Sequence, residues 1–170
     1  MTRHATISRP DVATAAATTG WRTWYLVATA ALAAYSTGLS WQAQFVSYPL
    51  FRVPTAAEFP GYHLAYNDAI LWVVIVPGFL TFLACAALPF TRPDGVSRAT
   101  AWVVALTGAG SLLSTVLWAI PLHDALDRIG QDAATIDSLL LANGLRTVFL
   151  TAGAIALSWC LARLIGGNRR

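Results

Sequence analysis

Four long apolar runs, separated by short polar connections, constrain the fold of this 170-residue chain more than any other feature. Helix rises 1.5 Å per residue, so about 20 residues cross the ~30 Å hydrocarbon core of a bilayer. Each run is long enough for that. The sequence therefore predicts an all-α integral membrane protein, a bundle of four transmembrane helices over about 22–49, 61–90, 98–121 and 138–166.

The charge content supports this prediction. Only 11% of residues are charged and 56% are hydrophobic, whereas soluble domains carry about 25% charged residues. No basic run is interleaved with aromatic residues, which excludes nucleic acid as a partner. We expect a disordered tail over 1–20 and one transmembrane domain over 21–170, with the lipid bilayer as its surroundings and a homo-oligomer left open.

The distribution of arginine predicts the orientation. Loops rich in arginine stay on the cytoplasmic side. The two termini and the 91–98 connection share most of these residues, and the other two connections hold only Arg52 and Arg128. We therefore expect both termini inside. The residues on the inner side are Arg3, Arg9, Arg22, Arg92, Arg98, Arg163, Arg169 and Arg170.

Polar side chains gather at the four helix ends that this topology brings together on the outer side. Ionisable groups inside a membrane are costly, and their default interpretation is functional. We therefore predict one site at this end of the bundle. Its residues are Trp41, Gln44 and Tyr48 from the first helix, Tyr62, His63, Tyr66 and Asn67 from the second, Trp118 and His123 from the third, and Asn143 and Arg146 from the fourth.

The residue types suggest their roles. The imidazole side chain ordinarily titrates near neutral pH, so His63 and His123 are predicted to move protons, with Tyr66 as a further proton donor. Arg146 is predicted to hold a carboxylate or a developing oxyanion. The others are predicted to bind substrate: Asn143, Tyr62, Asn67, Gln44, Tyr48, Trp41 and Trp118.

Several alternatives remain open at this point. Arg146 could instead form a structural ion pair with Glu58 or Asp68. His63 could be an interfacial residue, oriented in the functional case by Tyr66, Asn67 or Asp68. The acidic stretch with Asp124, Asp127 and Asp132 is interpreted as a solvated loop face. Cys85 and Cys160 form no CxxC motif and are interpreted as buried, unreactive thiols.

The motifs at this end resemble those of a widespread group of small, uncharacterised bacterial four-helix membrane proteins. The matching elements are Tyr48-Pro49-Leu50-Phe51, Tyr62-His63, Pro121-Leu122-His123 and Asn143-Gly144-Leu145-Arg146-Thr147. Gly144 stands where that group has tryptophan. By size, topology and the Asn-x-x-Arg element, the layout is also similar to the anthrone-oxygenase-like membrane proteins, which tailor aromatic polyketides without a recognised cofactor motif.

The resemblance implies a bacterial inner-membrane location. With the polar site, it leads us to expect an enzyme that tailors a lipophilic, polyketide- or terpenoid-like substrate. The expected chemistry is cyclisation, isomerisation or oxygenation without a cofactor or a metal. One alternative is a non-catalytic protein that binds or transports a lipophilic ligand. Another is a haem or metal protein with His63 and His123 as ligands.

Overall fold

The computed structural model describes residues 12–167, which form four long helices and no strand. Three of these helices contain a short π-helical segment, labelled η. The first consists of α1 (Val12–Gln42), η1 (Ala43–Ser47) and α2 (Tyr48–Leu50). The second consists of α3 (Phe59–Ile70), η2 (Leu71–Ile75) and α4 (Val76–Thr91). The third consists of α5 (Arg98–Ser114), η3 (Thr115–Ala119) and α6 (Ile120–Ile129), and the fourth is α7 (Ala133–Gly167).

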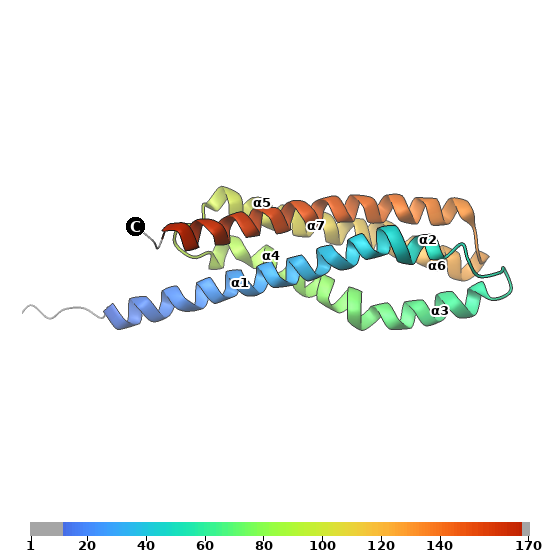
Figure 1. Ribbon diagram of the computed structural model, residues 1–170, viewed down its shortest axis with the longest axis horizontal. Coiled ribbons are helices and arrows are strands. Elements are labelled where there is room, and N and C mark those ends of the chain that lie inside the picture. The colour runs from blue at the N-terminus through green and yellow to red at the C-terminus, as the bar shows by residue number, and fades with distance from the viewer. Residues whose placement is uncertain (1–11, 168–170) are drawn as a thin grey trace, which may run out of the picture.

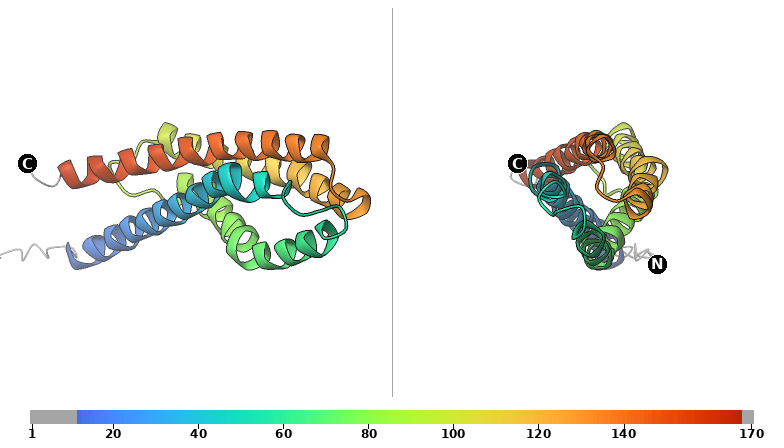
Figure 2. Two further views of the ribbon diagram at one scale, coloured as in Figure 1. Left: turned by 45° about the vertical axis from the view of Figure 1, so that its right-hand side comes forward. Right: turned by 90° about the vertical axis from the view of Figure 1, so that its right-hand side faces the viewer.

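The all-helical prediction is confirmed, and three helices of the described part have the length and hydropathy needed to cross a membrane. These are Phe59–Thr91, Arg98–Ile129 and Ala133–Gly166. The first helix packs alongside them. Figure 2 shows all four around a common axis, with α1 beside α4 and α7, and α5 between the same two neighbours on the other side.

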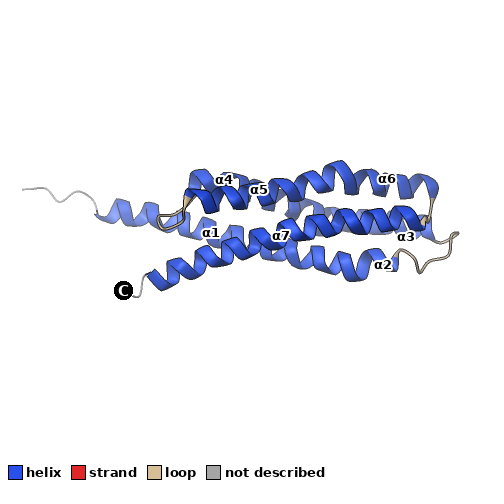
Figure 3. Cartoon of the chain, turned by 90° about the horizontal axis from the view of Figure 1, so that it is seen from above, coloured by secondary structure: helices blue, strands red, loops and turns tan. Residues whose placement is uncertain are grey.

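The two ends of the bundle differ in their connections (Figures 1 and 3). One end, here called the site end, carries the loops 51–58 and 130–132. The opposite end carries the loop 92–97 and both ends of the described chain. At the site end Gln131 Nε2 donates to the carbonyl oxygens of Phe51 at 2.8 Å and Pro54 at 2.9 Å. These bonds join the two loops and hold the end of the first helix in place.

Small residues bring the helices close together away from the site end. A Cβ added to Gly108 on α5 would lie 2.8 Å from Cys85 Cβ on α4. One added to Gly153 on α7 would lie 2.7 Å from the Thr107 hydroxyl. Close approach of this kind is typical of packing between membrane helices. Cys85 is a free thiol buried in this contact, as predicted.

Each π-helical segment ends two residues before a proline: Pro49, Pro77 and Pro121. A proline inside a helix has no N–H to donate, and its ring clashes with the carbonyl four residues earlier. The wider π turn relieves this clash and lets the helix continue. In a regular α-helix the Val73 carbonyl would accept from residue 77, which as a proline has no N–H, and the Tyr35 hydroxyl of α1 donates to that oxygen at 3.1 Å.

The helix bounds correct three predictions. The third helix was expected to end at Pro121, but η3 accommodates the proline and α6 continues to Ile129, where Gly130 turns the chain with a φ of 79°. The expected tail over 1–20 is helical from Val12 onward, and residues 1–11 lie outside the described part of the chain. The fourth helix begins at Ala133, five residues before Ser138, where it was expected.

Asp132 explains the early start of α7. Its carboxylate accepts hydrogen bonds from the Thr135 backbone N–H at 2.7 Å and from the Thr135 hydroxyl at 2.6 Å. An aspartate in this position satisfies a backbone donor that the first turn of a helix leaves free. The same two bonds lower the pKa of the Asp132 carboxyl.

Candidate active site

Four side chains at the site end form a hydrogen-bonded chain, here called the relay. Asp127 Oδ1 lies 2.6 Å from His63 Nδ1. His63 Nε2 lies 3.0 Å from His123 Nδ1, and His123 Nε2 lies 3.4 Å from the Tyr48 hydroxyl. The last contact is long for a hydrogen bond. Asp127 and His123 lie on α6, His63 on α3 and Tyr48 on α2. The relay therefore joins the third, second and first of the four helices.

The chemistry of the groups gives the relay a direction. A carboxylate can only accept, so His63 Nδ1 carries the proton donated to Asp127. With both imidazoles neutral, His63 Nε2 then accepts from His123 Nδ1, and His123 Nε2 accepts from the Tyr48 hydroxyl. Every donor thus points from Tyr48 toward Asp127. A proton leaving Tyr48 can pass along this chain to the carboxylate.

Local helix geometry and aromatic packing hold the relay together. His123 and Asp127 are four residues apart on α6 and so share one face. His63 is fully buried and stacks on Phe59, with ring centroids 5.3 Å apart. Phe51 packs edge-on against both histidines, at 5.2 Å from His63 and 6.1 Å from His123. The two rings are therefore fixed in an apolar cage.

Asp127 is the end of the relay that reaches the surface. Its side chain is 45% exposed, whereas that of His63 is 1% exposed. The Asn67 amide donates to Asp127 Oδ2 at 3.3 Å, which fixes the second carboxylate oxygen. Asp127 can thus exchange protons with its surroundings while His63 cannot.

A second polar network links α7 to α1 around Arg146. Arg146 Nη2 donates to Asn143 Oδ1 at 2.7 Å, and Arg146 Nε donates to the Ser40 hydroxyl at 3.3 Å. The Asn143 amide donates to Gln44 Oε1 at 2.7 Å. Ser40 also lies 2.7 Å from the Thr147 hydroxyl. These contacts hold the guanidinium in one orientation.

Arg146 has no acidic partner among the described residues. The ion pairs there are Arg52 with Asp137 and His63 with Asp127. Glu58 instead accepts two hydrogen bonds from Thr55 in its own loop, and these lower the pKa of its carboxyl. Arg146 is nevertheless 7% exposed. A buried cation whose charge no carboxylate offsets is costly, which favours a ligand-binding role over a structural ion pair.

Arg146 lies between two cavities. The larger has a volume of about 470 Å³ and is lined by Tyr48, Tyr66, Asn67 and His123 among others. The smaller, of about 200 Å³, extends toward the opposite end and has a mostly apolar lining that also includes the hydroxyl groups of Ser36, Ser111 and Thr115. Arg146 borders both, as do five apolar or hydroxyl-bearing neighbours: Leu39, Val74, Ile75, Thr115 and Ile120.

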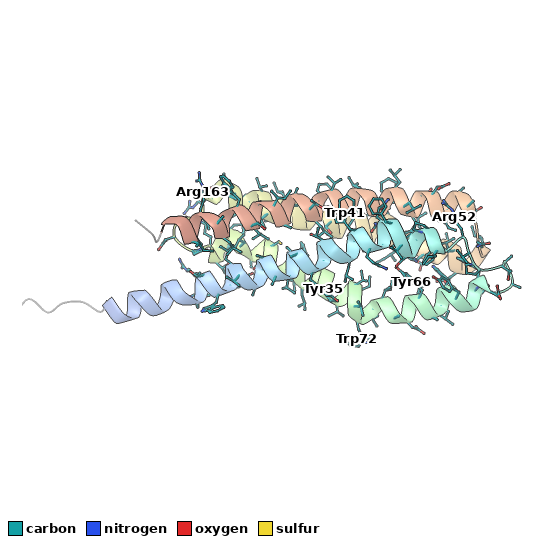
Figure 4. The ribbon with its side chains drawn as sticks, in the orientation of Figure 1. Tyr35, Trp41, Arg52, Tyr66, Trp72 and Arg163 are labelled. Atoms are coloured by element: carbon teal, nitrogen blue, oxygen red, sulfur yellow. The ribbon has the colours of Figure 1, made fainter. Side chains whose placement is uncertain are left out.

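The larger cavity opens sideways between the first and second helices. Its lining residues Gln42 on α1 and Ala69, Leu71 and Val73 on α3–η2 are exposed. Figures 1 and 2 show α3 curving away from α2 at this level. Figure 4 shows Tyr66 turned toward α2 and Trp72 turned outward. Access to the cavity is therefore through the side of the bundle.

The structure brings together only part of the predicted site. Tyr48, Tyr66, Asn67, His123 and Arg146 line the larger cavity. His63 lies behind His123, one step further from the cavity. Asn143 and Gln44 position Arg146 and do not line this cavity, and Gln44 borders a shallow hollow on the outer surface.

Three predicted binding residues lie elsewhere. Trp41 points toward α7, as Figure 4 shows, where its Nε1 donates to the Thr151 hydroxyl at 3.2 Å. Trp118 borders the same surface hollow as Gln44. Tyr62 is 38% exposed and packs edge-on against Phe51. None of the three lines the larger cavity.

Two residues of the site were not predicted. Asp127 was assigned to a solvated loop because the third helix was expected to end at Pro121. Its spacing of four residues from His123 is the signal that could have identified it. Ser40 had no such signal, since a serine within an apolar run is common in closely packed membrane helices.

The haem alternative does not fit this geometry. His63 and His123 are stacked with ring centroids 5.2 Å apart and bond directly to each other. Two axial ligands must instead face the iron from opposite sides of a porphyrin. Within residues 12–167, no group of three or more histidine, cysteine, aspartate or glutamate residues is arranged to hold a metal ion.

Comparison with other proteins assigns no family to the chain. It matches no protein-family model, no curated protein and no solved structure. The function of the site must therefore be inferred from its own geometry.

Proposed function

We propose that this chain is a membrane-embedded enzyme that moves protons to and from a lipophilic small molecule. The observation that carries the proposal is the meeting of two features in one cavity. One is the relay, which ends at Tyr48 and His123 on the cavity wall. The other is Arg146, a buried cation that no acidic residue among those described neutralises. A proton path beside a fixed positive charge suits a reaction through an oxyanion.

We also propose how the protein lies in the membrane. All four helices cross the bilayer of a bacterial inner membrane, with both termini in the cytoplasm and the site end outside. The arginine distribution supports this orientation. The side opening between the first and second helices then faces lipid, so that a hydrophobic substrate reaches the cavity without passing through water.

The reaction begins with removal of a proton from a carbon next to a carbonyl group. The C–H bond breaks, the proton passes to His123 Nε2 directly or through Tyr48, and the electron pair forms an enolate. Arg146 stabilises the enolate oxygen. Return of the proton to another carbon gives an isomer, attack of the enolate on an internal carbonyl gives a ring, and reaction with O₂ as oxidant gives an oxygenated product.

Tyr66 serves as a further donor in this scheme. It lines the cavity, and its ring stacks on His123 with centroids 6.0 Å apart. The resemblance to bacterial four-helix membrane proteins also supports the proposal. Its motifs coincide with Tyr48, His63, His123 and Arg146, which belong to the relay and the cation.

A non-catalytic binding or transport protein is the second candidate. It is favoured by the side opening, which would serve a protein that only exchanges a ligand with the bilayer. The relay favours the enzyme, because it gives a proton removed from a substrate carbon a path out of the cavity, and carbon–hydrogen exchange distinguishes the two candidates.

The test is carbon–hydrogen exchange in D₂O. Membranes containing the full-length chain are incubated with a panel of lipophilic ketones, β-diketones and anthrones, and deuterium incorporation is followed by mass spectrometry. We expect exchange above that of membranes lacking the protein. His123→Gln and Arg146→Met should each reduce the exchange rate by at least about 100-fold, the usual contribution of a positioned acid or base or of an oxyanion donor.

Arg163→Met is the matched control, because Arg163 lies at the other end of α7, as Figure 4 shows, with its guanidinium over the Trp159 ring. It should retain full exchange. No exchange by the wild-type chain with any member of the panel would contradict the enzymatic proposal and favour the binding protein.

A further inference from the structure

The uncompensated charge of Arg146 indicates what kind of ligand the cavity accepts. The guanidinium has five N–H donors, of which Nε and one Nη2 hydrogen bond within the protein. The guanidinium also lies within hydrogen-bond reach of the Tyr48 hydroxyl on the cavity wall, and no carboxylate among the described residues pairs with it. An arginine that borders a cavity and has no carboxylate partner is suited to an oxyanion, which would offset the charge and accept hydrogen bonds from the guanidinium.

The two cavities give the ligand its shape. Arg146 borders both, so an acidic oxygen bound there would lie between them. The smaller cavity, of about 200 Å³, is lined by Leu39, Phe79, Leu112 and Leu150 among others and suits a hydrocarbon group. The larger, of about 470 Å³, has the relay residues Tyr48 and His123 on its wall and the side opening. The ligand is thus an amphiphile with one acidic group.

The route of entry sets the protonation state of the free ligand. A path through the side opening leads from lipid, and an isolated charge in hydrocarbon is strongly disfavoured. A weak acid enters by this route in its neutral form. At Arg146 the anion is the favoured form, because an opposite charge within a few ångströms typically lowers the pKa of an acid by about 1–3 units. One proton must then leave the cavity.

We infer that the cavity binds a lipophilic weak acid as its conjugate base, with the acidic oxygen on Arg146, and that the relay carries the released proton to Asp127. The acid contains a carboxylic, phenolic or enolic O–H group. This inference rests on the proposed function for the membrane-facing entry, but its test requires no turnover.

The proton transfer balances in five steps. The ligand O–H bond breaks and its proton passes to the Tyr48 oxygen, while Tyr48 gives its own proton to His123 Nε2. His123 Nδ1 gives a proton to His63 Nε2, and His63 Nδ1 gives one to Asp127 Oδ1. Asp127 releases that proton to water. The anion remains with Arg146, and return of one proton along the same path restores both histidine tautomers.

A chromogenic acid provides the test. The full-length protein in non-ionic micelles is mixed with an alkyl-substituted nitrophenol, whose phenolate absorbs visible light. The pH is set one unit below the pKa of the probe measured in empty micelles, so that about one tenth of the free probe is ionised. We expect the phenolate-to-phenol ratio of the bound probe to rise by at least about tenfold, which is the lower limit of the pKa shift given above.

Variants separate the cation from the relay. Arg146→Met should abolish the rise, Arg146→Lys should retain part of it, and Arg163→Met should leave it unchanged. Asp127→Asn should leave the final ratio unchanged but slow the appearance of phenolate by at least about tenfold in stopped-flow measurements, since a positioned proton acceptor contributes at least that much.

Each outcome decides the inference. No phenolate enrichment by the wild-type protein overturns it, whatever the variants do. Enrichment that survives in Arg146→Met overturns the role of the guanidinium, and unchanged kinetics in Asp127→Asn overturn the exit path. Phenolate enrichment without carbon–hydrogen exchange would support this inference and contradict the proposed enzymatic function. Carbon–hydrogen exchange without phenolate enrichment would contradict this inference and support the enzymatic function.

Discussion

Replacing Tyr35 by phenylalanine should weaken the fold only while Pro77 is present. Pro77 has no N–H, so the Val73 carbonyl lacks the donor that a regular α-helix would give it, and it accepts from the Tyr35 hydroxyl at 3.1 Å. Tyr35 is 46% exposed, on a surface that we assign to lipid, where no water replaces a lost donor. Tyr35→Phe therefore removes a hydrogen-bond donor from this carbonyl in hydrocarbon.

The magnitude follows from this one bond. A neutral intramolecular hydrogen bond contributes about 0.5–1.5 kcal/mol, and bonds between membrane helices average about 0.6 kcal/mol. We expect Tyr35→Phe to lower the free energy of unfolding by about 1 kcal/mol, roughly a fivefold change in the equilibrium constant. Pro77→Ala restores a backbone N–H that can donate to the same Val73 carbonyl. In that background Tyr35→Phe should lower the free energy of unfolding by less than about 0.3 kcal/mol, the usual error of additivity.

The assay is a double-mutant cycle measured by reversible unfolding in mixed micelles. Tyr25→Phe is the matched control, because the Tyr25 hydroxyl donates at 2.8 Å to the carbonyl of Ala84, which keeps its own helical donor from Leu88. Its cost should be the same with proline or alanine at position 77. An equal cost of Tyr35→Phe in both backgrounds would refute the explanation that Tyr35 replaces the donor lost at Pro77.

Two further predictions concern packing and capping. Gly108→Val should lower the free energy of unfolding by about 1–3 kcal/mol, because a Cβ there would lie 2.8 Å from Cys85 Cβ. Gly61→Ala, which meets open space, should be nearly neutral in the same unfolding assay. Because hydrogen bonds from Thr135 lower the pKa of Asp132, the cap of α7 should be complete above the ordinary pKa of about 3.9 and be lost as the pH falls through the lowered folded value. Amide exchange at Thr135 should report this loss, and Asp132→Asn should remove its pH dependence.

Hydrophobic pattern was sufficient to predict the four helices but not all of their ends. The apolar runs and the proline-containing turns place the helices correctly because membrane spans need long uninterrupted stretches. The rule that a proline ends a helix failed at Pro121, where η3 accommodates the ring and α6 continues to Ile129. Local sequence does not show whether a neighbouring π turn will form, since its extra width must be filled by tertiary packing.

The same error explains the main gap in the predicted site. Beyond a helix that ends at Pro121, Asp127 belongs to a loop. On a helix that continues, it lies one turn past His123 and beside His63. The convergence of His123 and Arg146 on one cavity was predictable from topology, because the polar ends of four antiparallel helices meet. The contacts that orient them, such as that of Ser40 with Arg146, depend on helix rotation, which the pattern does not determine.

The π turns have a consequence for how this bundle can change over time. A π turn is equivalent to one residue inserted into an α-helix, and each residue of an α-helix advances the chain by about 100°. Deleting one residue from η3 together with replacing Pro121 would give a regular helix but rotate His123 and Asp127 by more than a quarter turn, away from His63. Each π turn thus lets the two halves of its helix differ in rotation about the helix axis. A single insertion or deletion at the π turn can therefore change the direction of the polar side chains while the apolar half keeps its packing.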